Sequence, residues 1–384
     1  MNTTTFSKPI WSVAFRPFFF LAIVIALFPT VLWVLSLTGI HSFQTTPFSP
    51  NQWHANEMIF GFLQSVIIGF LLTASPKWTG TRGIHSGALF FFTLLFFFTR
   101  IIYWFLPFNS TLPYQTLGTL IPFCLITHLT VLFLKTKSYK QFIIVTPLLI
   151  LIPAQILILE DEYKLGYDLS LAAIRFLIVV IAGRIIPFFT KNALNLNFQG
   201  HSSALEKLLL LTMLILIFKP LLPLTRGIWI GLTVFAILLN ITRISSWKFF
   251  ASRKNPILFI LYLAYLWIPI HLLLIVLNSF HITSDLGRSS LHALSYGCFG
   301  LMTLGMIHRV TLGHTGRMIQ ATQNTKICYY TLFIGSLIRV FGPLFYPSFY
   351  LQWMSISGVL WVLSFLMLGI EIIPMLFSPR IDNK

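Results

Sequence analysis

The densest group of residues that could do chemistry lies at the start of an apolar stretch, in the run Trp53-His54-Ala55-Asn56-Glu57-Met58. His54 and Glu57 are three positions apart, so they share one face of a helix. A carboxylate at this place could orient a metal-bound imidazole, hold a proton, or stabilise the start of the helix. The first two roles make Glu57 a candidate catalytic residue and His54 a candidate metal ligand.

Three further histidines belong to the apolar stretch near 289–311 and its end. His292 lies near its start, while His308 and His314 lie at its end. On a helix, His308 would point nearly opposite to His292. Hydropathy places His292 in the outer half of a membrane and His308 and His314 in the inner half. Two such groups would suit two metal centres, or one metal centre and a proton route.

Small and cationic residues near these histidines allow two interpretations each. Gly297, Gly300 and Gly305 would let either a flat cofactor or a neighbouring helix approach closely. Arg184 could neutralise a buried propionate, phosphate or carboxylate, or it could extend to the lipid headgroups. Four histidines lie in predicted loops and are expected to be solvated: His41, His85, His201 and His281.

The elements that must position these residues are membrane-spanning helices. Of 384 residues, 57% are hydrophobic and 9% are charged, whereas about a quarter are charged in soluble proteins. Runs of about 20 apolar residues can cross the hydrocarbon layer as helices, and the alternation typical of barrel strands is absent. We predict one all-α polytopic transmembrane bundle over residues 1–384, with 6+6 halves as a common arrangement in such chains. About twelve spans are expected, near 17–39, 54–74, 84–107, 114–134, 141–159, 169–189, 205–221, 226–247, 256–278, 289–311, 327–346 and 350–376.

The formal net charge of +17 is distributed unevenly along the chain. The N-terminus, the even-numbered loops and the C-terminus carry 18 of the 26 Lys and Arg residues. By the positive-inside rule, both termini are predicted to face the cytoplasm. The surplus of basic residues therefore indicates how the chain is oriented in the membrane and an attraction to anionic lipid. No nucleic-acid binding is expected. The three cysteines are scattered, which argues against disulfides, zinc sites and iron–sulfur clusters.

Seven motifs, in order from the N-terminus to the tenth predicted span, together resemble the NnrS family. They are Phe15-Arg16-Pro17-Phe18-Phe19, Trp53-His54-x-x-Glu57-Met58, Gly69-Phe70-Leu71-Leu72-Thr73, Trp78-Thr79-Gly80, Gly183-Arg184-x-Ile186-Pro187, Leu291-His292-Ala293-Leu294 and Leu312-Gly313-His314-Thr315-Gly316-Arg317. The resemblance implies a multi-pass protein of the bacterial inner membrane that contains haem and copper and is associated with resistance to nitric oxide and nitrosative stress. Residues of this chain at matching family positions are His54, Glu57, Arg184, His292, His314 and Arg317.

The chain departs from the family pattern at two places. Asn56 and Tyr262 stand where the resemblance leads us to expect histidines. An amide is a poor metal ligand beside an imidazole, and phenolate ligation of haem is uncommon. Either this chain has lost a metal centre, or the two family histidines support the ligands from outside the metal's coordination sphere.

The leading hypothesis is a membrane protein with b-type haem that binds or removes nitric oxide. His54 and His292 are the candidate haem ligands, Arg184 is a candidate cofactor-binding residue, and His314 with His308 is a candidate second metal centre, for which copper is the implied metal. Turnover as a nitric oxide reductase-like oxidoreductase would need an electron donor, which the sequence does not identify, and homo-oligomer formation stays open. The rival hypotheses are a secondary transporter of a small solute without a metal cofactor and, ranked last, a membrane scaffold.

Overall fold

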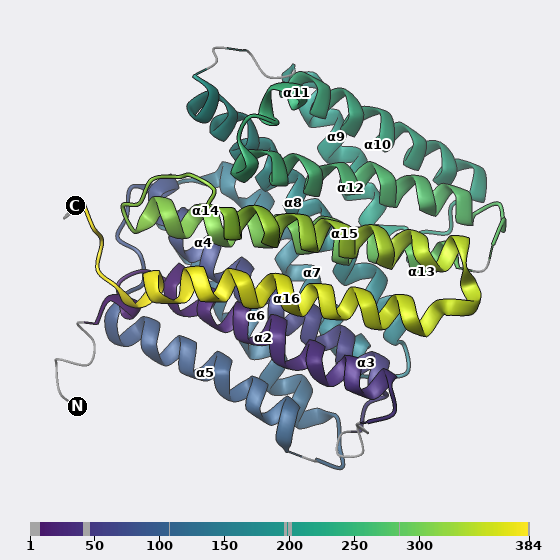
Figure 1. Ribbon diagram of the computed structural model, residues 1–384, viewed down its shortest axis with the longest axis horizontal. Coiled ribbons are helices and arrows are strands. Elements are labelled where there is room, and N and C mark those ends of the chain that lie inside the picture. Colours follow the sequence, from purple (N-terminus) through teal and green to yellow (C-terminus); the bar gives the residue numbers. More distant parts are fainter. Residues whose placement is uncertain are drawn as a thin grey trace. The chain divides into compact units, whose positions relative to one another are not determined.

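A computed structural model describes residues 8–40, 47–106, 108–195, 198, 202–283 and 285–382. His41 and His201 lie outside the described residues. Every element of the described residues is helical (Figure 1), as predicted. The bounds are η1 Pro9–Trp11, α2 Phe15–Leu37, α3 Pro50–Asn56, η2 Glu57–Leu63, α4 Gln64–Thr79, α5 Ser86–Phe105, α6 Leu112–Lys135, η3 Tyr139–Gln141, α7 Phe142–Ile158, α8 Tyr163–Leu194, α9 Ser203–Ile215, η4 Leu216–Phe218, α10 Arg226–Ser246, α11 Phe249–Ser252, α12 Pro256–Asn278, α13 Leu286–His292, η5 Ala293–Gly300, α14 Leu301–His314, α15 Gln323–Phe345, η6 Pro347–Phe349 and α16 Tyr350–Phe377.

Eleven helices of the described residues are long and apolar enough to cross a membrane. They correspond to eleven of the twelve expected spans, so the chain is a multi-pass membrane protein. The expected span near 205–221 is formed by α9, which has 13 residues, and by the 3₁₀ turn η4. Together they reach about 26 Å. Pro220 and Pro223 follow directly and prevent the helix from continuing.

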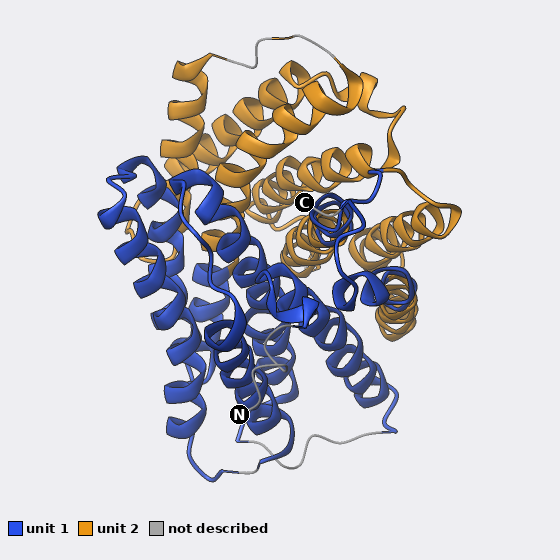
Figure 2. Cartoon of the chain, turned by 90° about the vertical axis from the view of Figure 1, so that its left-hand side faces the viewer, with its two compact units in different colours: residues 1–170, 307–319, 365–384 blue, residues 171–306, 320–364 orange. Residues whose placement is uncertain are grey.

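The chain divides into two compact units, which are coloured separately in Figure 2. Unit 1 comprises residues 1–170, 307–319 and 365–384, and unit 2 comprises residues 171–306 and 320–364. Each unit is discontinuous in sequence, because the last parts of α14 and α16 belong to unit 1. The single membrane domain over 1–384 stays a prediction.

Aromatic side chains form much of the core of unit 1, where α2 packs against η2 and α4. Phe15, Phe18 and Phe19 are fully buried. Gly69 lies opposite them, and a Cβ atom there would come within 3.0 Å of Phe18 and Phe19. The glycine in this motif thus lets α4 approach α2 closely.

Glycines play the same part in unit 2, where α12 packs against α10, α13 and η5. A Cβ at Gly297 would lie 2.5 Å from the indole of Trp267, and a Cβ at Gly300 would lie 2.7 Å from Trp361. A Cβ at Gly305 would meet Ile260 at 2.7 Å. The space beside these three glycines is therefore filled by side chains of neighbouring helices, which decides between the two interpretations in favour of helix packing.

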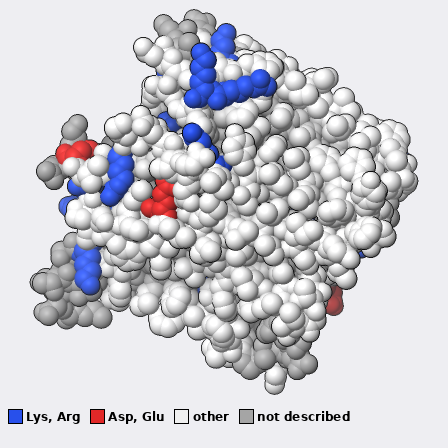
Figure 3. Space-filling model, viewed as in Figure 1, with Lys and Arg blue, Asp and Glu red and all other residues white. Residues whose placement is uncertain are grey.

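Charged side chains are sparse on the face shown in Figure 3. They gather at the top and toward the left of this view, and most of the remaining face is free of them. Large apolar side chains such as Phe91, Phe123 and Leu238 are more than half exposed. Such exposure would be unfavourable in water and is what a lipid-facing helix requires.

The beginning of α2 and the end of α16 lie together in unit 1. The Arg16 guanidinium donates from Nη1 to the backbone carbonyls of Met375 (3.3 Å), Leu376 (2.7 Å) and Ser378 (2.7 Å). Two helix ends that share one arginine must lie on the same side of the membrane, so the chain crosses an even number of times. Because eleven long helices alone would give an odd number, this supports α9 with η4 as a twelfth crossing. That the shared side is the cytoplasmic one stays a prediction.

We expect Arg16→Met to release the C-terminal segment. The substitution removes a charged donor from three carbonyls at the end of α16, and hydrogen bonds to charged groups contribute about 1.5–3 kcal/mol each. Trypsin should then cleave after Arg380 about tenfold faster or more, as followed by intact mass. Lys8→Met, which removes an exposed cation from the same end of unit 1, is the control and should leave the rate unchanged. Equal rates in wild type and Arg16→Met would refute this role.

Candidate functional site

The Glu57 carboxylate is fully buried in unit 1 and is held by three donors. Arg100 Nη1 on α5 donates to Oε1 at 3.0 Å, and Trp104 Nε1 donates to Oε2 at 2.7 Å. Asn56 Nδ2 donates to Oε1 at 3.3 Å. Arg100 is itself only 1% exposed, so the pair is a membrane-buried ion pair. Its burial excludes the interpretation of Glu57 as a solvated residue at a helix start.

The helix that carries His54 is fixed at its beginning by a capping box. The Ser49 hydroxyl accepts from the backbone N–H of Gln52, whose side chain accepts from the N–H of Ser49. Pro50 occupies the first turn of α3, where its missing N–H is harmless. His54 follows on this helix, half-buried, and its ring stacks on the indole of Trp33 with 4.3 Å between centroids and 14° between planes.

Asn56 explains part of the departure from the family pattern. It is fully buried and donates to the Glu57 carboxylate. A neutral imidazole could donate one hydrogen bond from this position as well. Asn56 therefore holds the Glu57 carboxylate in place. This agrees with the second alternative above, in which the family histidine at this position supports a ligand without binding the metal itself.

Two π-helices adjoin the two candidate haem ligands, and sequence reasoning missed both. The first, η2, begins at Glu57, three residues after His54, and the second, η5, begins directly after His292. π-helices are rare and frequently lie at functional sites. In η2, a Cβ at Gly61 would come within 3.0 Å of Glu57 Oε2. This glycine therefore makes room for the carboxylate.

His292 lies at the end of α13 in unit 2 and is half-buried. Its Nε2 is 3.0 Å from Nη2 of Arg339 on α15, and its Nδ1 is 3.5 Å from the Ser295 hydroxyl. Because a guanidinium only donates, Nε2 is the accepting nitrogen and the imidazole is neutral. The same guanidinium contacts Met354 Sδ. Arg339 and His292 are 47 positions apart in the sequence.

A second imidazole in unit 2 is held in the same way. His271 Nδ1 lies 2.7 Å from the carbonyl of Ser290, so Nδ1 donates. Its Nε2 lies 3.0 Å from Nη1 of Arg175 on α8, so Nε2 accepts. His271 and Arg175 are both more than nine-tenths buried. Neutral, oriented imidazoles of this kind are what metal binding by histidine requires.

The two candidates for a second metal centre have separate partners within unit 1. His308 is fully buried and pairs with Glu371 of α16, with 3.4 Å between Nε2 and Oε1. His314 ends α14, with Nε2 3.4 Å from Lys77 Nζ and its ring 5.4 Å from that of Phe15. Glu371 was not singled out from the sequence, although an acidic residue inside a predicted span was the available signal. Among the described residues, no group of three or more His, Cys, Asp and Glu side chains could hold a metal ion.

Arg184 is exposed on α8, whereas the neighbouring Gly183 faces a buried arginine of unit 2. That arginine, Arg243, donates to the Glu206 carboxylate, to the Val179 carbonyl (2.9 Å) and to the Tyr265 hydroxyl (2.7 Å). Arg243 falls near the end of the expected span 226–247, among the basic residues that were counted toward the even-numbered, cytoplasmic loops. The structure instead places it, fully buried, near the end of α10.

Tyr262, the second departure from the family pattern, is also fully buried. Its hydroxyl donates to the carbonyl of Trp247 and lies 2.8 Å from the Thr190 hydroxyl. The phenol is thus used to connect α12 with the end of α10 and with α8, all within unit 2.

The residues present fit a haem in their donor chemistry. His54 and His292 offer half-buried imidazoles, and His292 is neutral and so has a lone pair for a metal. The Arg339 guanidinium beside His292 is the type of donor that a propionate carboxylate would accept from. The two histidines belong to different units, His54 to unit 1 and His292 to unit 2.

A family model described as NnrS protein matches residues 9–380 of the chain. This match covers nearly the whole sequence, including all the helices described above. No curated protein matches the chain.

Proposed function

Because the chain belongs to the NnrS family, we propose that this multi-pass membrane protein binds b-type haem and binds or removes nitric oxide, protecting a bacterial cell from nitrosative stress at its inner membrane. The observation that carries the proposal is the setting of His54 and His292. Each is a half-buried imidazole that adjoins a π-helix within a long apolar helix.

Membrane burial suits the proposed ligand. Nitric oxide is a small neutral molecule, so it enters the hydrocarbon layer without the desolvation cost that a charged solute has. A bound haem would supply an iron atom to which the gas can coordinate. A site within the lipid bilayer is therefore directly accessible to nitric oxide that has dissolved there.

The residues of this chain have separable roles in the proposal. His54 and His292 are the candidate haem ligands, and Arg339 orients His292 through its Nε2 until a metal takes that lone pair. Glu57 is a positioning residue rather than an open proton donor, because Arg100, Trp104 and Asn56 occupy its oxygens. Arg184 stays a candidate partner for a propionate or a lipid headgroup. His308 and His314 stay candidates for a second centre such as copper.

The test is the absorption spectrum of the purified protein, oxidised and dithionite-reduced, with iron and copper analysis of the same sample. We expect a Soret band that shifts with nitric oxide and that loses most of its intensity in His54→Ala or His292→Ala. His281→Asn is the matched control, because His281 is exposed in a loop with positive φ, which asparagine adopts readily. A colourless preparation from cells supplied with ample haem would reject the proposal and place a secondary transporter first.

A further inference from the structure

A cavity of about 440 Å³ lies at one end of unit 1, where α4 ends and α5 begins. This volume is in the range of small-molecule sites. Its charged and imidazole lining comes from Lys8, Lys77, Arg82, His85 and His314, and none of the Asp and Glu residues that the structure describes lines it. A cavity with several cations and no carboxylate is suited to an anion.

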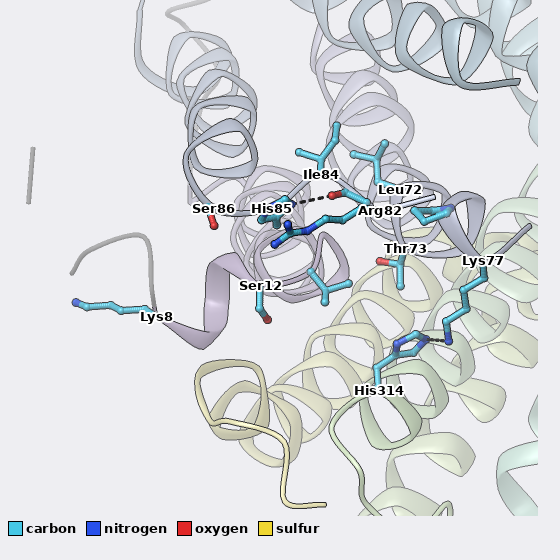
Figure 4. A pocket seen from close by; sticks show the side chains of 13 residues that line it. Lys8, Ser12, Leu72, Thr73, Lys77, Arg82, Ile84, His85, Ser86 and His314 are labelled. Atoms are coloured by element: carbon cyan, nitrogen blue, oxygen red, sulfur yellow. Dashed lines mark hydrogen bonds between the residues drawn. The ribbon is translucent and has the colours of Figure 1, made fainter. Parts of the chain in front are cut away.

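The cations stand on opposite sides of this cavity. Figure 4 shows Lys77 beside His314 on one side and Arg82 beside His85 on the other, with Thr73 between them. The three strongest cations, Lys8, Lys77 and Arg82, are exposed. Within the described part of the chain, none of these three forms a salt bridge. Their charges are thus available to a ligand.

Polar groups that bind phosphate oxygens complete the lining. Ser12, Thr73 and Ser86 contribute hydroxyls. Ser86 also begins α5, a helix of 20 residues whose N-cap residue, His85, makes no side-chain capping bond. His85 Nδ1 lies instead 2.9 Å from the carbonyl of Gly83. The first N–H groups of α5 consequently add to the positive potential that the side chains create.

We propose that this cavity binds a phosphate-bearing anion, supplied either by the headgroup of an anionic phospholipid or by soluble phosphate. Its place supports the proposal, because the cavity adjoins the beginning of α2. This helix end shares Arg16 with the end of α16, and the charge distribution predicts that it is cytoplasmic. Basic pockets between membrane helices on that side are suited to anionic headgroups. The inference is independent of haem binding.

The experiment measures binding to the purified full-length protein by native mass spectrometry with phosphatidylglycerol and phosphatidylcholine, and by thermal shift with inorganic phosphate and chloride. The test variant is Lys77→Gln/Arg82→Gln, which removes two exposed charges from the cavity. The control is Lys135→Gln/Lys140→Gln, which removes two exposed charges from the end of α6 and from η3, outside the cavity. Thermal midpoints close to wild type in both variants establish that they are folded.

We expect phosphatidylglycerol to bind more tightly than phosphatidylcholine, and the cavity variant to lose about tenfold or more in affinity while the control changes little. Stabilisation by inorganic phosphate as well would identify the phosphate group itself as the ligand. Binding of phosphatidylglycerol without stabilisation by inorganic phosphate would identify the lipid as the source. An equal loss in both variants, or no preference for either phosphate-bearing anion over its control, would overturn the proposal.

Discussion

Glu57→Leu is expected to destabilise the protein by about 3–5 kcal/mol, because it leaves the Arg100 guanidinium buried without a counter-charge. The hydrogen bond from Trp104 is lost as well. Thermal unfolding in detergent, followed by fluorescence-detected size exclusion, measures the effect as a large drop in the midpoint and in the yield of monodisperse protein.

A double variant separates the charge effect from the loss of volume. Glu57→Leu/Arg100→Leu removes both charges, and we expect it to recover much of the stability that the single variant loses, since paired apolar replacements of buried ion pairs are often tolerated. Glu160→Gln, at an exposed loop position, is the control. A single variant as stable as wild type would show that Arg100 finds other compensation, and the assignment of Glu57 as a positioning residue would then fail.

The second large effect is expected for Gly183→Ala. A methyl group there would overlap Nη2 of Arg243, which cannot move freely because Glu206, Val179 and Tyr265 bind its guanidinium. Displacing Arg243 from Glu206 breaks a partly buried ion pair in addition to overpacking the site, so we expect a loss of about 3 kcal/mol. The same thermal unfolding assay measures it.

Gly231→Ala is the matched control for this prediction. Gly231 lies on α10, the helix that carries Arg243, and a Cβ there would meet no atom within 4 Å. Alanine in an open helical position is expected to be neutral or to stabilise by up to about 1 kcal/mol. If both glycine variants behaved alike, the contact between Gly183 and Arg243 would not matter for stability.

Local sequence signals located the helices and several site residues, because those signals depend on the chain near each residue. The apolar runs predicted the long helices, and Glu57 drew attention as an acidic residue in an apolar setting. Its partner Arg100 is 43 positions away, and such pairing depends on which helices pack together. The same holds for Arg339 with His292 and for Glu371 with His308.

Burial of charge was harder to predict than helix position. Arg243 lies among other basic residues near a predicted loop. The sequence therefore predicted that it is one of the cytoplasmic cations that orient the chain in the membrane. Its burial follows from Glu206, whose carboxylate reaches it from α9, and from the space left by Gly183. The π-helices also escaped prediction, because an i to i+5 hydrogen-bond pattern has no distinct apolar period at this length.

The contact between Arg16 and the end of α16 has a consequence for biosynthesis. Arg16 and its acceptor Leu376 are separated by 360 positions, and ribosomes add about 5–20 residues per second. The guanidinium is therefore made roughly 20 to 70 seconds before its carbonyl acceptors. During that interval the Arg16 guanidinium lacks the three carbonyls that it binds in the folded protein. A chain that stops before Met375 would therefore lack all three of these hydrogen bonds.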